Sequence, residues 1–290
     1  MIATVSHRVR HMIDRHLRGR VATCQVRGHT IVLETQTDME RFRARTYATK
    51  EPETLDWIEQ YLRPDDVLYD IGANIGLYAL YAAKVLGGRC SIYAFEPEAL
   101  NHAKLSVNIY RNRLSGVVLP CCVALTDTLG FGTFYLHPCP DGVGGRDAGL
   151  VAGSSLHSFG VAEDFRGLLF EPNHQQGTIG VQLDTVWREW GLPFPNHVKI
   201  DVDGLEAKVI AGATQTLADP RLRSVLVEIQ EDRQGADALI RTIEVAGLHQ
   251  VTEFSARSRR ALVGSPYAGS VNYVFAREAE AVAGRMREVR

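Results

Sequence analysis

The chain has 290 residues, 45% of them hydrophobic and 23% charged, so it can bury a full core and most simply forms one large α/β domain. Its formal net charge of -2 and pI near 6.6 offer no general attraction to nucleic acid or to an anionic membrane, so neither partner is expected. The chain has five cysteines and no Cys-x-x-Cys pair, which predicts neither disulfides nor structural zinc. It has no apolar run that could span a bilayer and no signal-peptide core, so a cytoplasmic protein is expected.

The first 50 residues predict a cap ahead of the main domain. Residues 1–20 are basic and carry apolar side chains at helical spacing, which is typical of an amphipathic helix that packs on the domain or on a partner subunit. A targeting peptide or a membrane-surface helix would share that pattern. Residues 21–35 alternate in part and break at Arg27 and Gly28, which predicts a hairpin. We assign residues 1–50 to the N-terminal cap, 51–277 to the main domain and 278–290 to a charged, helix-prone tail.

The main domain is organised around residues 67–76, which read VLYDIGANIG and follow a predicted helix around Trp57. A short apolar run, a glycine turn and a second apolar segment predict a strand, a turn and a helix N-terminus. Asp70 stands two residues ahead of Gly72 and would repel a pyrophosphate, whereas S-adenosylmethionine (SAM) carries a sulfonium and an ammonium group and no phosphate. The turn therefore favours SAM, unless Asp70 only caps the turn or the next helix.

A second strand at residues 91–95 ends in Glu96 and Pro97. An acidic residue at this point is placed to accept hydrogen bonds from both ribose hydroxyls of a nucleoside. The alternative is that Glu96 caps the helix that begins near Pro97. The predicted cofactor-binding residues are Asp70, Gly72, Ala73, Asn74, Gly76, Glu96 and Pro97.

The middle of the chain is less regular. The next helix is expected to bury one face formed by Leu100, Ala103, Val107 and Tyr110. Residues 117–125 predict a buried third strand, and residues 126–136 predict a hairpin arm. Residues 137–160 are rich in glycine, and we interpret them as a substrate lid containing Gly153, Ser154, Ser155, Leu156 and His157, with a plain mobile insertion as the alternative.

The last part of the chain predicts further strands and helices. Strands are expected at residues 178–183, 197–202, 224–229, 250–254 and 270–276, with Asp184 after the first of these and Glu228 within the third. Together with the earlier units they predict a doubly wound, mostly parallel, seven-stranded Rossmann-like sheet, the class I methyltransferase fold, with an N-terminal helix and hairpin cap.

Ligands of open α/β sheets lie at the carboxyl ends of the strands, which makes Asp201 and its neighbours the predicted catalytic region. Asp201 and His157 are candidate general bases, and Lys199 is either a substrate contact or a strand residue that faces solvent at the sheet edge. Asp201, Asp203 and Glu206 could gather Mg²⁺, but Asp203 and Glu206 also have the spacing of a helix capping box. We favour the cap and predict no metal.

The order of these motifs resembles that of the FkbM-type methyltransferases. The Asp70-Ile-Gly-Ala-Asn-Ile-Gly76 turn, Phe95-Glu96-Pro97, Leu183-Asp184 and the segment KIDVDGLE at residues 199–206 carry the resemblance. It implies a SAM-dependent methyltransferase that acts on a hydroxyl of a small molecule such as a sugar or a polyketide. Asp203 departs from the pattern, because the family more often has Glu there. The chain could also form a homo-oligomer.

Two other functions compete with this interpretation. An NAD-dependent oxidoreductase would need Gly-x-Gly-x-x-Gly, and the turn has Ala73 and Asn74 in place of further glycines. A scaffold protein could keep the nucleoside site without turnover. A nucleic-acid methyltransferase is disfavoured, since the chain lacks an Asn/Asp-Pro-Pro-Tyr/Phe stretch for a flipped base.

Overall fold

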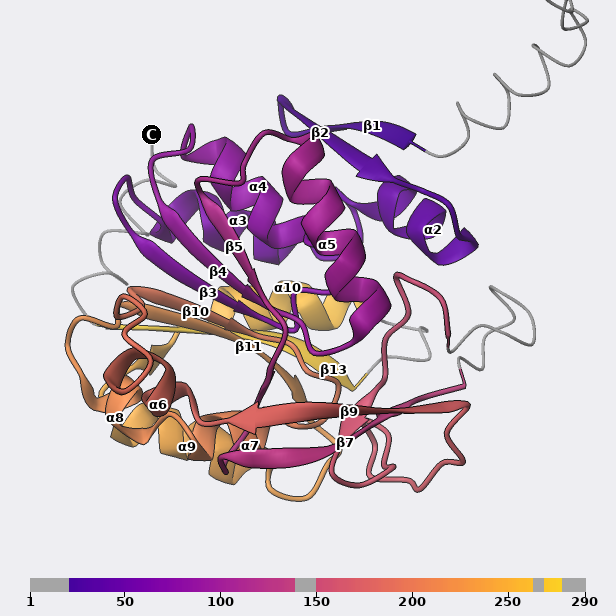
Figure 1. The fold of residues 1–290 in the computed structure, drawn as a ribbon. Helices are drawn as coiled ribbons and strands as arrows, with labels where there is room; N and C mark the ends of the chain where they lie inside the picture. Colours follow the sequence, from indigo (N-terminus) through magenta and orange to yellow (C-terminus); the bar gives the residue numbers. More distant parts are fainter. Residues whose placement is uncertain (1–20, 139–149, 263–268, 278–290) are drawn as a thin grey trace, which may run out of the picture.

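The computed structural model describes residues 21–138, 150–262 and 269–277. Its centre is a seven-stranded sheet in the order β12-β13-β11-β10-β3-β4-β5, parallel except for β13 (Figure 1). The strands are β3 (Val67–Ile71), β4 (Ser91–Phe95), β5 (Val118–Cys121), β10 (His197–Ile200), β11 (Ser224–Gln230), β12 (His249–Gln250) and β13 (Ser270–Ala276). The predicted fold class is confirmed.

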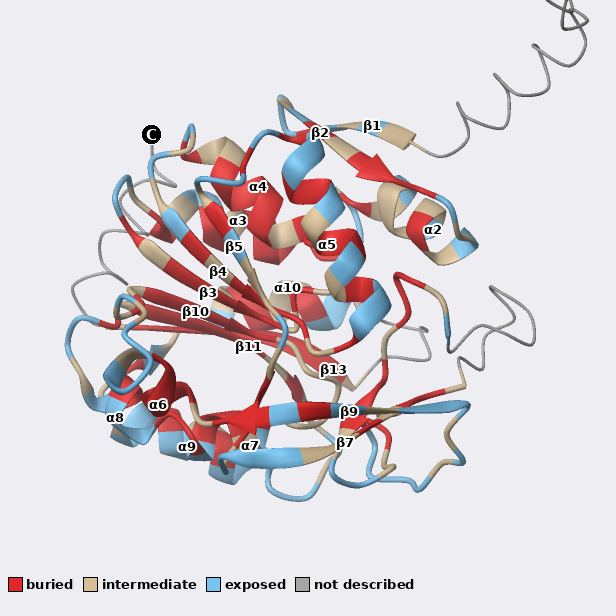
Figure 2. Ribbon diagram, in the orientation of Figure 1, coloured by how far each residue is buried: buried red, intermediate tan, exposed pale blue. Residues whose placement is uncertain are grey.

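Helices cover both faces of this sheet, as expected for strands that are apolar on both sides (Figure 2). One face carries α3 (Pro52–Tyr61), α4 (Leu77–Val85), α5 (Ala99–Arg111) and α10 (Thr252–Leu262). The other face carries α6 (Leu183–Arg188), α7 (Glu206–Ala211), α8 (Thr214–Ala218) and α9 (Ala236–Val245). No helix in the described ranges is both long and apolar enough to cross a bilayer.

A smaller four-stranded sheet, which the sequence did not predict, lies beside the first. It contains β6 (Ala124–Leu125), β7 (Gly130–Leu136), β8 (Ser158–Phe159) and β9 (His174–Val181) in the order β6-β9-β7-β8. The predicted single strand at residues 117–125 is therefore wrong, because the run divides into β5 in the large sheet and β6 in the small one. Since β5 is an edge strand, Leu119 is 52% exposed rather than buried.

The predicted hairpin near the N-terminus is confirmed as β1 (Val21–Val26) and β2 (His29–Glu34). Its turn uses positive φ angles, 48° at Arg27 and 85° at Gly28. Helix α2 (Asp38–Thr46) was not predicted, although its capping box is visible in the sequence: the Thr37 hydroxyl accepts from the Glu40 backbone N–H, and the Glu40 carboxylate accepts from that of Thr37. The expected helices at residues 1–20 and 278–290 lie outside the described residues.

The predicted buried face of α5 is also wrong. Leu100, Ala103, Val107 and Tyr110 are all exposed, whereas the buried side chains are Asn101, Lys104, Leu105, Asn108 and Ile109. The reason is the hairpin, which needs polar partners. Asn108 accepts from the Glu34 backbone N–H at 2.9 Å, and Lys104 pairs with the Glu34 carboxylate at 2.7 Å. Hydrogen bonding to β2 thus outweighs the apolar spacing of the helix.

The expected strand at residues 250–254 is only partly formed. β12 ends at Gln250, and α10 begins at Thr252. Phe254 lies on the first turn of that helix, fully buried against the Tyr61 ring of α3 at a centroid distance of 6.1 Å. Packing between two helices therefore decides the conformation of a short segment whose pattern was ambiguous.

Candidate functional site

The glycine turn after β3 is pressed against the end of β10. Gly72 has a φ of 77°, and a Cβ atom there would lie 1.8 Å from the Asp201 carbonyl oxygen. The backbone N–H groups of Gly72 and Ala73 donate to the Phe95 carbonyl at 3.0 Å, and that of Asp201 donates to Ile71 at 3.1 Å. Only glycine fits between these strand ends. The turn, the end of β4 and Asp201 are therefore held together.

Two of the predicted cofactor-binding residues, Asp70 and Gly76, make contacts that hold the glycine turn and the helices that follow it in place. The Asp70 carboxylate is buried, accepts from the Ala79 backbone N–H at 3.1 Å and lies 3.7 Å from Lys199. At Gly76, where φ is 93°, a Cβ atom would meet the Leu105 side chain at 2.5 Å, so glycine lets α4 and α5 pack closely. The capping interpretation of Asp70 matches this geometry, and direct contact between Asp70 and a cofactor stays a prediction.

Lys199 lies on a central strand, so the alternative that placed it at the solvent-facing sheet edge is wrong. Its side chain is 2% exposed, and its ammonium lies 2.9 Å from Asp201 Oδ2 and over the Tyr78 ring at 5.0 Å. Burial opposes its charge, but the carboxylates of Asp201 and Asp70 outweigh burial and raise the pKa of Lys199. Lys199 therefore holds the Asp201 carboxylate in place through their ion pair and acts as a positioning residue.

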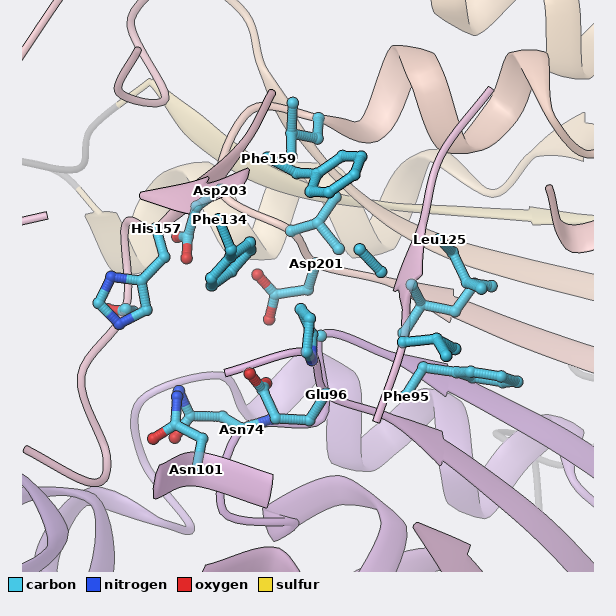
Figure 3. A pocket seen from close by; sticks show the side chains of 18 of the residues that line it. Asn74, Phe95, Glu96, Asn101, Leu125, Phe134, His157, Phe159, Asp201 and Asp203 are labelled. Atoms are coloured by element: carbon cyan, nitrogen blue, oxygen red, sulfur yellow. The ribbon is translucent and has the colours of Figure 1, made fainter. Parts of the chain in front are cut away.

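A small cavity of about 60 Å³ opens at the carboxyl ends of β3, β4 and β10 (Figure 3). Glu96 and Asp201 face each other across it, Phe95 and Leu125 form an apolar end, and His157 lies at the opposite end. We call this the first cavity, and its further lining residues include Gly72, Asn74, Pro97, Asn101, Phe134, Ser154, Ser155, Phe159 and Asp203.

Glu96 is the buried acid of the first cavity. Its carboxylate accepts from the backbone N–H groups of Asn74 at 2.8 Å and Glu98 at 2.9 Å. Burial, reinforced by the nearby Glu98 charge, raises the pKa of Glu96 to about 8. The alternative that Glu96 caps α5 is wrong, because Glu98 is the N-cap and accepts from Leu100 and Asn101.

A second, larger cavity of about 510 Å³ adjoins the first. It is covered by α2 and bounded by α10 and β13, and its lining residues include Met39, Phe42, Arg43, Lys50, Glu51, Glu53, Leu156, Phe165, Glu228, Ser258 and Asn272. The two cavities share five wall residues, Gly72, Asn74, Ser155, Asp201 and Asp203. The two cavities therefore adjoin beside Asp201.

Comparison with known proteins identifies the family. Residues 70–254 match the model of the methyltransferase FkbM domain. The chain belongs to the FkbM methyltransferase family. It is 33% identical over 180 residues to 31-O-demethyl-FK506 methyltransferase FkbM of Streptomyces tacrolimicus, covering 59% of this chain and 67% of that protein.

More distant similarities extend over more of the chain. Hexuronic acid methyltransferase AglP of Haloferax volcanii is 26% identical over 208 residues, covering 71% of this chain and 72% of that protein. The solved METTL16 methyltransferase domain has a TM-score of 0.42 and 12% identity, covering 90% of this chain and 87% of the other.

In this methyltransferase, His157 is not suited to the predicted role of general base. Its ring is 6% exposed, and Nδ1 accepts from the His137 backbone N–H at 3.1 Å, so the neutral ring carries its proton on Nε2. Burial, with a smaller effect of His137, lowers the pKa of His157 to about 3. Nε2 is buried and has no partner among the described residues, and His157 lines the first cavity.

The described part of the predicted lid lies on the walls of both cavities. The Ser154 carbonyl accepts from the side-chain amides of Asn74 at 2.7 Å and Asn101 at 3.1 Å. The Leu156 backbone N–H donates to Asp203 Oδ2 at 2.7 Å. Residues 154–156 are thus tied to the glycine turn, to α5 and to the end of β10.

The predicted capping box at Asp203 and Glu206 is not formed. Asp203 lies in a left-handed turn with φ 53°, and α7 begins three residues later at Glu206. Glu206 turns back instead and accepts from the backbone N–H groups of Val202 at 3.1 Å and Gly204 at 3.2 Å. Burial raises the pKa of Asp203 to about 6 and that of Glu206 to about 7. Glu206 is thereby withdrawn from any shared site with Asp201.

Sequence reasoning missed most of the second cavity. The side chains from α2, including Phe42 and Arg43, and those of Ser258 and Asn272 lie outside the matched residues 70–254. The capping box at Thr37 could have revealed α2, but no local pattern indicates that α2 covers the strand ends. Part of the wall of the larger cavity therefore lies outside the segment that matches the family.

Proposed function

We propose that this protein is a SAM-dependent O-methyltransferase that transfers the methyl group to a hydroxyl of a small molecule. The observation that carries the proposal is the junction of the two cavities at Gly72, Asn74 and Asp201. A donor held in the first cavity and an acceptor held in the second would meet there, as an in-line displacement requires. Alignment of this kind supplies up to about 7–11 kcal/mol in favourable systems.

The chemistry of the first cavity suits the parts of SAM. The Glu96 carboxylate faces the space where ribose hydroxyls would donate, and Phe95 and Leu125 provide apolar surface for adenine. Gly72 and Asn74 are placed for the methionyl group, and the negative charge of Asp201 favours a sulfonium over a phosphate. A pyrophosphate would face the carboxylate of Asp201, which disfavours NAD.

Cofactor entry requires movement, because the first cavity is smaller than a whole SAM molecule. The nearest movable wall is the segment at Ser154, whose carbonyl is held by Asn74 and Asn101. We propose that residues 154–157 act as the lid over the donor, opening by loss of these two hydrogen bonds.

The second cavity would hold the acceptor, with Asp201 as the base that removes the hydroxyl proton. A positioned base contributes about 10²- to 10⁴-fold. The matched relatives named above are, by name, methyltransferases of an O-demethylated FK506 and of a hexuronic acid, both small hydroxylated molecules. Their names support a small hydroxylated acceptor for this chain, and its partners are accordingly expected to be small molecules.

Calorimetric titration of the full chain with SAM, and separately with NAD, tests the proposal. Binding of SAM alone is expected, and it should precede transfer of labelled methyl groups from SAM to a panel of sugars and hydroxylated metabolites. Binding of NAD alone would overturn the proposal in favour of an oxidoreductase. Binding of SAM without transfer to any hydroxylated acceptor would favour a scaffold protein.

A further inference from the structure

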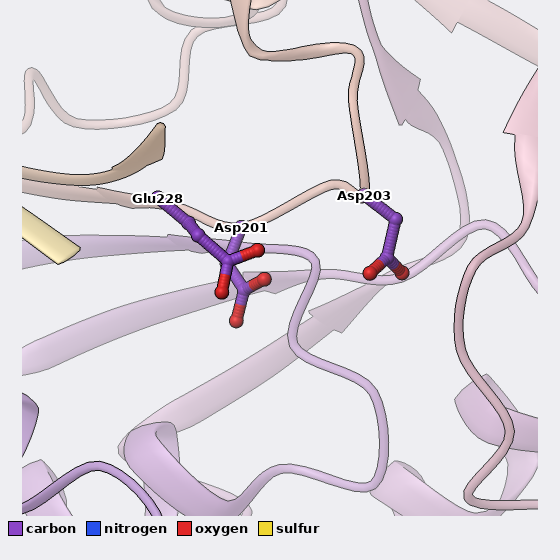
Figure 4. A group of neighbouring side chains, drawn as sticks. All are labelled: Asp201, Asp203 and Glu228. Atoms are coloured by element: carbon purple, nitrogen blue, oxygen red, sulfur yellow. The ribbon is translucent and has the colours of Figure 1, made fainter. Parts of the chain in front are cut away.

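Three carboxylates converge on the floor of the second cavity (Figure 4). Asp201 follows β10, Asp203 lies in the next turn, and Glu228 lies on β11. One oxygen from each of these side chains lies within 4.8 Å of those of the other two. The sequence had grouped Asp201 and Asp203 with Glu206, but the parallel pairing of β10 with β11 brings Glu228 to them instead.

Each of the three carboxylates keeps an oxygen free of protein donors. Lys199 contacts Oδ2 of Asp201, and the Leu156 N–H contacts Oδ2 of Asp203. Within the described ranges, no donor contacts the Oδ1 atom of either aspartate, and no hydrogen bond or ion pair is made by Glu228. Lys199 offsets the charge of Asp201 and also faces Asp70, but no cationic side chain of the described residues pairs with Asp203 or Glu228.

A fourth carboxylate in the same cavity is independently unsatisfied. The Glu53 side chain is 2% exposed, and its Oε1 accepts from the Asn272 amide at 2.9 Å. Its Oε2 atom is buried and has no partner among the described residues. Asn272 lies directly opposite Glu228 in the β11/β13 ladder, so the side chains of Asn272 and Glu228 are on the same face of the sheet. Glu53 contacts Asn272 and therefore lies on that face as well.

The remaining charges of the cavity do not neutralise this group. Five carboxyl groups line the second cavity, from Glu51, Glu53, Asp201, Asp203 and Glu228, against the cations of Arg43 and Lys50. Lys50 is paired with Glu51 at 2.6 Å, and Arg43 donates from Nε to the Gly153 carbonyl at 2.6 Å. A compact cation with oxygen ligands fits this excess of carboxylates.

We propose that Asp201, Asp203 and Glu228 bind one divalent cation of the Mg²⁺ type, with Glu53 accepting a hydrogen bond from a water on that cation. Hard divalent cations take several oxygen ligands and keep some of their waters, which suits three carboxylates on an open cavity floor. Binding itself does not depend on the proposed function.

The role of the cation in transfer does rest on the proposed function. An acceptor hydroxyl that replaces one of its waters would have a lowered pKa and lose its proton to solvent, so with the cation bound Asp201 would serve as a ligand in place of the base. Its oxygen would then form a bond to the methyl carbon while the carbon–sulfur bond of SAM breaks. The products are a methyl ether, S-adenosylhomocysteine and one proton.

The test uses Mn²⁺ as the probe, because free and bound Mn²⁺ differ in their electron paramagnetic resonance signal. The full chain, treated with EDTA and then freed of it, is titrated with Mn²⁺ alone and in competition with Mg²⁺. One site is expected, with Asp203→Asn and Glu228→Gln each weakening Mn²⁺ binding at least tenfold. The exposed Glu171 provides the matched control, so Glu171→Gln should leave the affinity unchanged.

The chosen variants preserve folding contacts. An asparagine at 203 can still accept from Leu156, and Glu228 has no described hydrogen bond to lose. No bound Mn²⁺, or equal affinity in the wild type and both variants, would overturn the proposal. Calorimetric binding of SAM in the presence of EDTA reports on the donor site separately, so loss of one site is distinguishable from loss of the other.

Discussion

The Glu96→Gln substitution tests the donor site most directly. Glu96 is 5% exposed, its carboxylate has backbone donors at 2.8 and 2.9 Å, and burial raises its pKa to about 8. A hydrogen bond to an ionised acceptor contributes about 1 kcal/mol more than one to a neutral acceptor. For two ribose hydroxyls the difference is about 2 kcal/mol, or about 30-fold in SAM affinity once Glu96 is ionised.

The same values predict a pH dependence. Below the pKa of Glu96 the protonated acid resembles glutamine, so the ratio of wild-type to variant affinity should lie near one at pH 6. It should reach about 15 at pH 8 and about 30 above pH 9, as the carboxyl ionises. Titration of SAM itself affects both proteins equally and cancels in this ratio, which calorimetry measures directly.

The difference in folding stability between wild type and Glu96→Gln should shrink as pH rises, whereas the difference in SAM affinity grows. The folded-state pKa of Glu96 lies above its ordinary value of 4.5, so its contribution to folding is present at low pH and is lost as pH rises through about 8. In the variant the amide NH₂ must face one of the two backbone N–H groups, which costs about 1–3 kcal/mol. The variant should therefore be less stable at pH 5, with a smaller difference at pH 9.

Glu98→Gln is the matched control, because Glu98 caps α5 and does not line the first cavity. It should lower the melting temperature and leave the SAM affinity above pH 9 unchanged. The midpoint of the pH dependence should move to lower pH, because the Glu98 charge helps to raise the pKa of Glu96. An affinity ratio for Glu96→Gln that stays constant from pH 6 to pH 9 would refute the ribose assignment.

Three further changes test the surroundings of the site. Lys199→Met leaves the buried Asp70 carboxylate and the partly exposed Asp201 carboxylate without their cation, and the free energy of unfolding in urea should fall by about 3–5 kcal/mol; a change within about 1 kcal/mol would contradict the positioning role. Asp184→Ala removes the acceptor of two backbone N–H groups at the start of α8, at 2.8 and 2.9 Å, and should cost about 1–3 kcal/mol in the same assay with SAM affinity unchanged. The pH–rate profile of methyl transfer between pH 5 and 8 should have the same shape in wild type and His157→Asn, since the pKa of His157 is about 3; a step near pH 6.5 that the variant abolishes would restore the histidine as a base.

The sequence alone predicted the glycine turn, the main parallel sheet and the residues that line the candidate site. The glycine turn at residues 67–76, the acid at Glu96 and the strand that ends before Asp201 are local patterns, and each depends on residues adjacent in the chain. Because parallel strands bring their carboxyl ends to one edge, the pattern also predicted that these residues meet. The structure places Gly72, Asn74, Glu96 and Asp201 on one cavity, as expected.

Only the tertiary structure decided the features that depend on contacts between distant segments. Hydrogen bonds to β2 cause α5 to bury its polar face. The run that was predicted as one strand is divided between β5 in the large sheet and β6 in the small sheet. One backbone N–H, from His137, fixes the proton of His157 on Nε2. Pairing of β10 with β11 places Glu228 beside Asp201. The predicted neighbour, Glu206, lies elsewhere because its carboxylate accepts a hydrogen bond from the Val202 backbone N–H in the preceding turn. Local spacing cannot reveal these hydrogen-bond and strand partners, because they come from segments that are distant in the sequence. They meet only when the folded chain pairs its backbone groups.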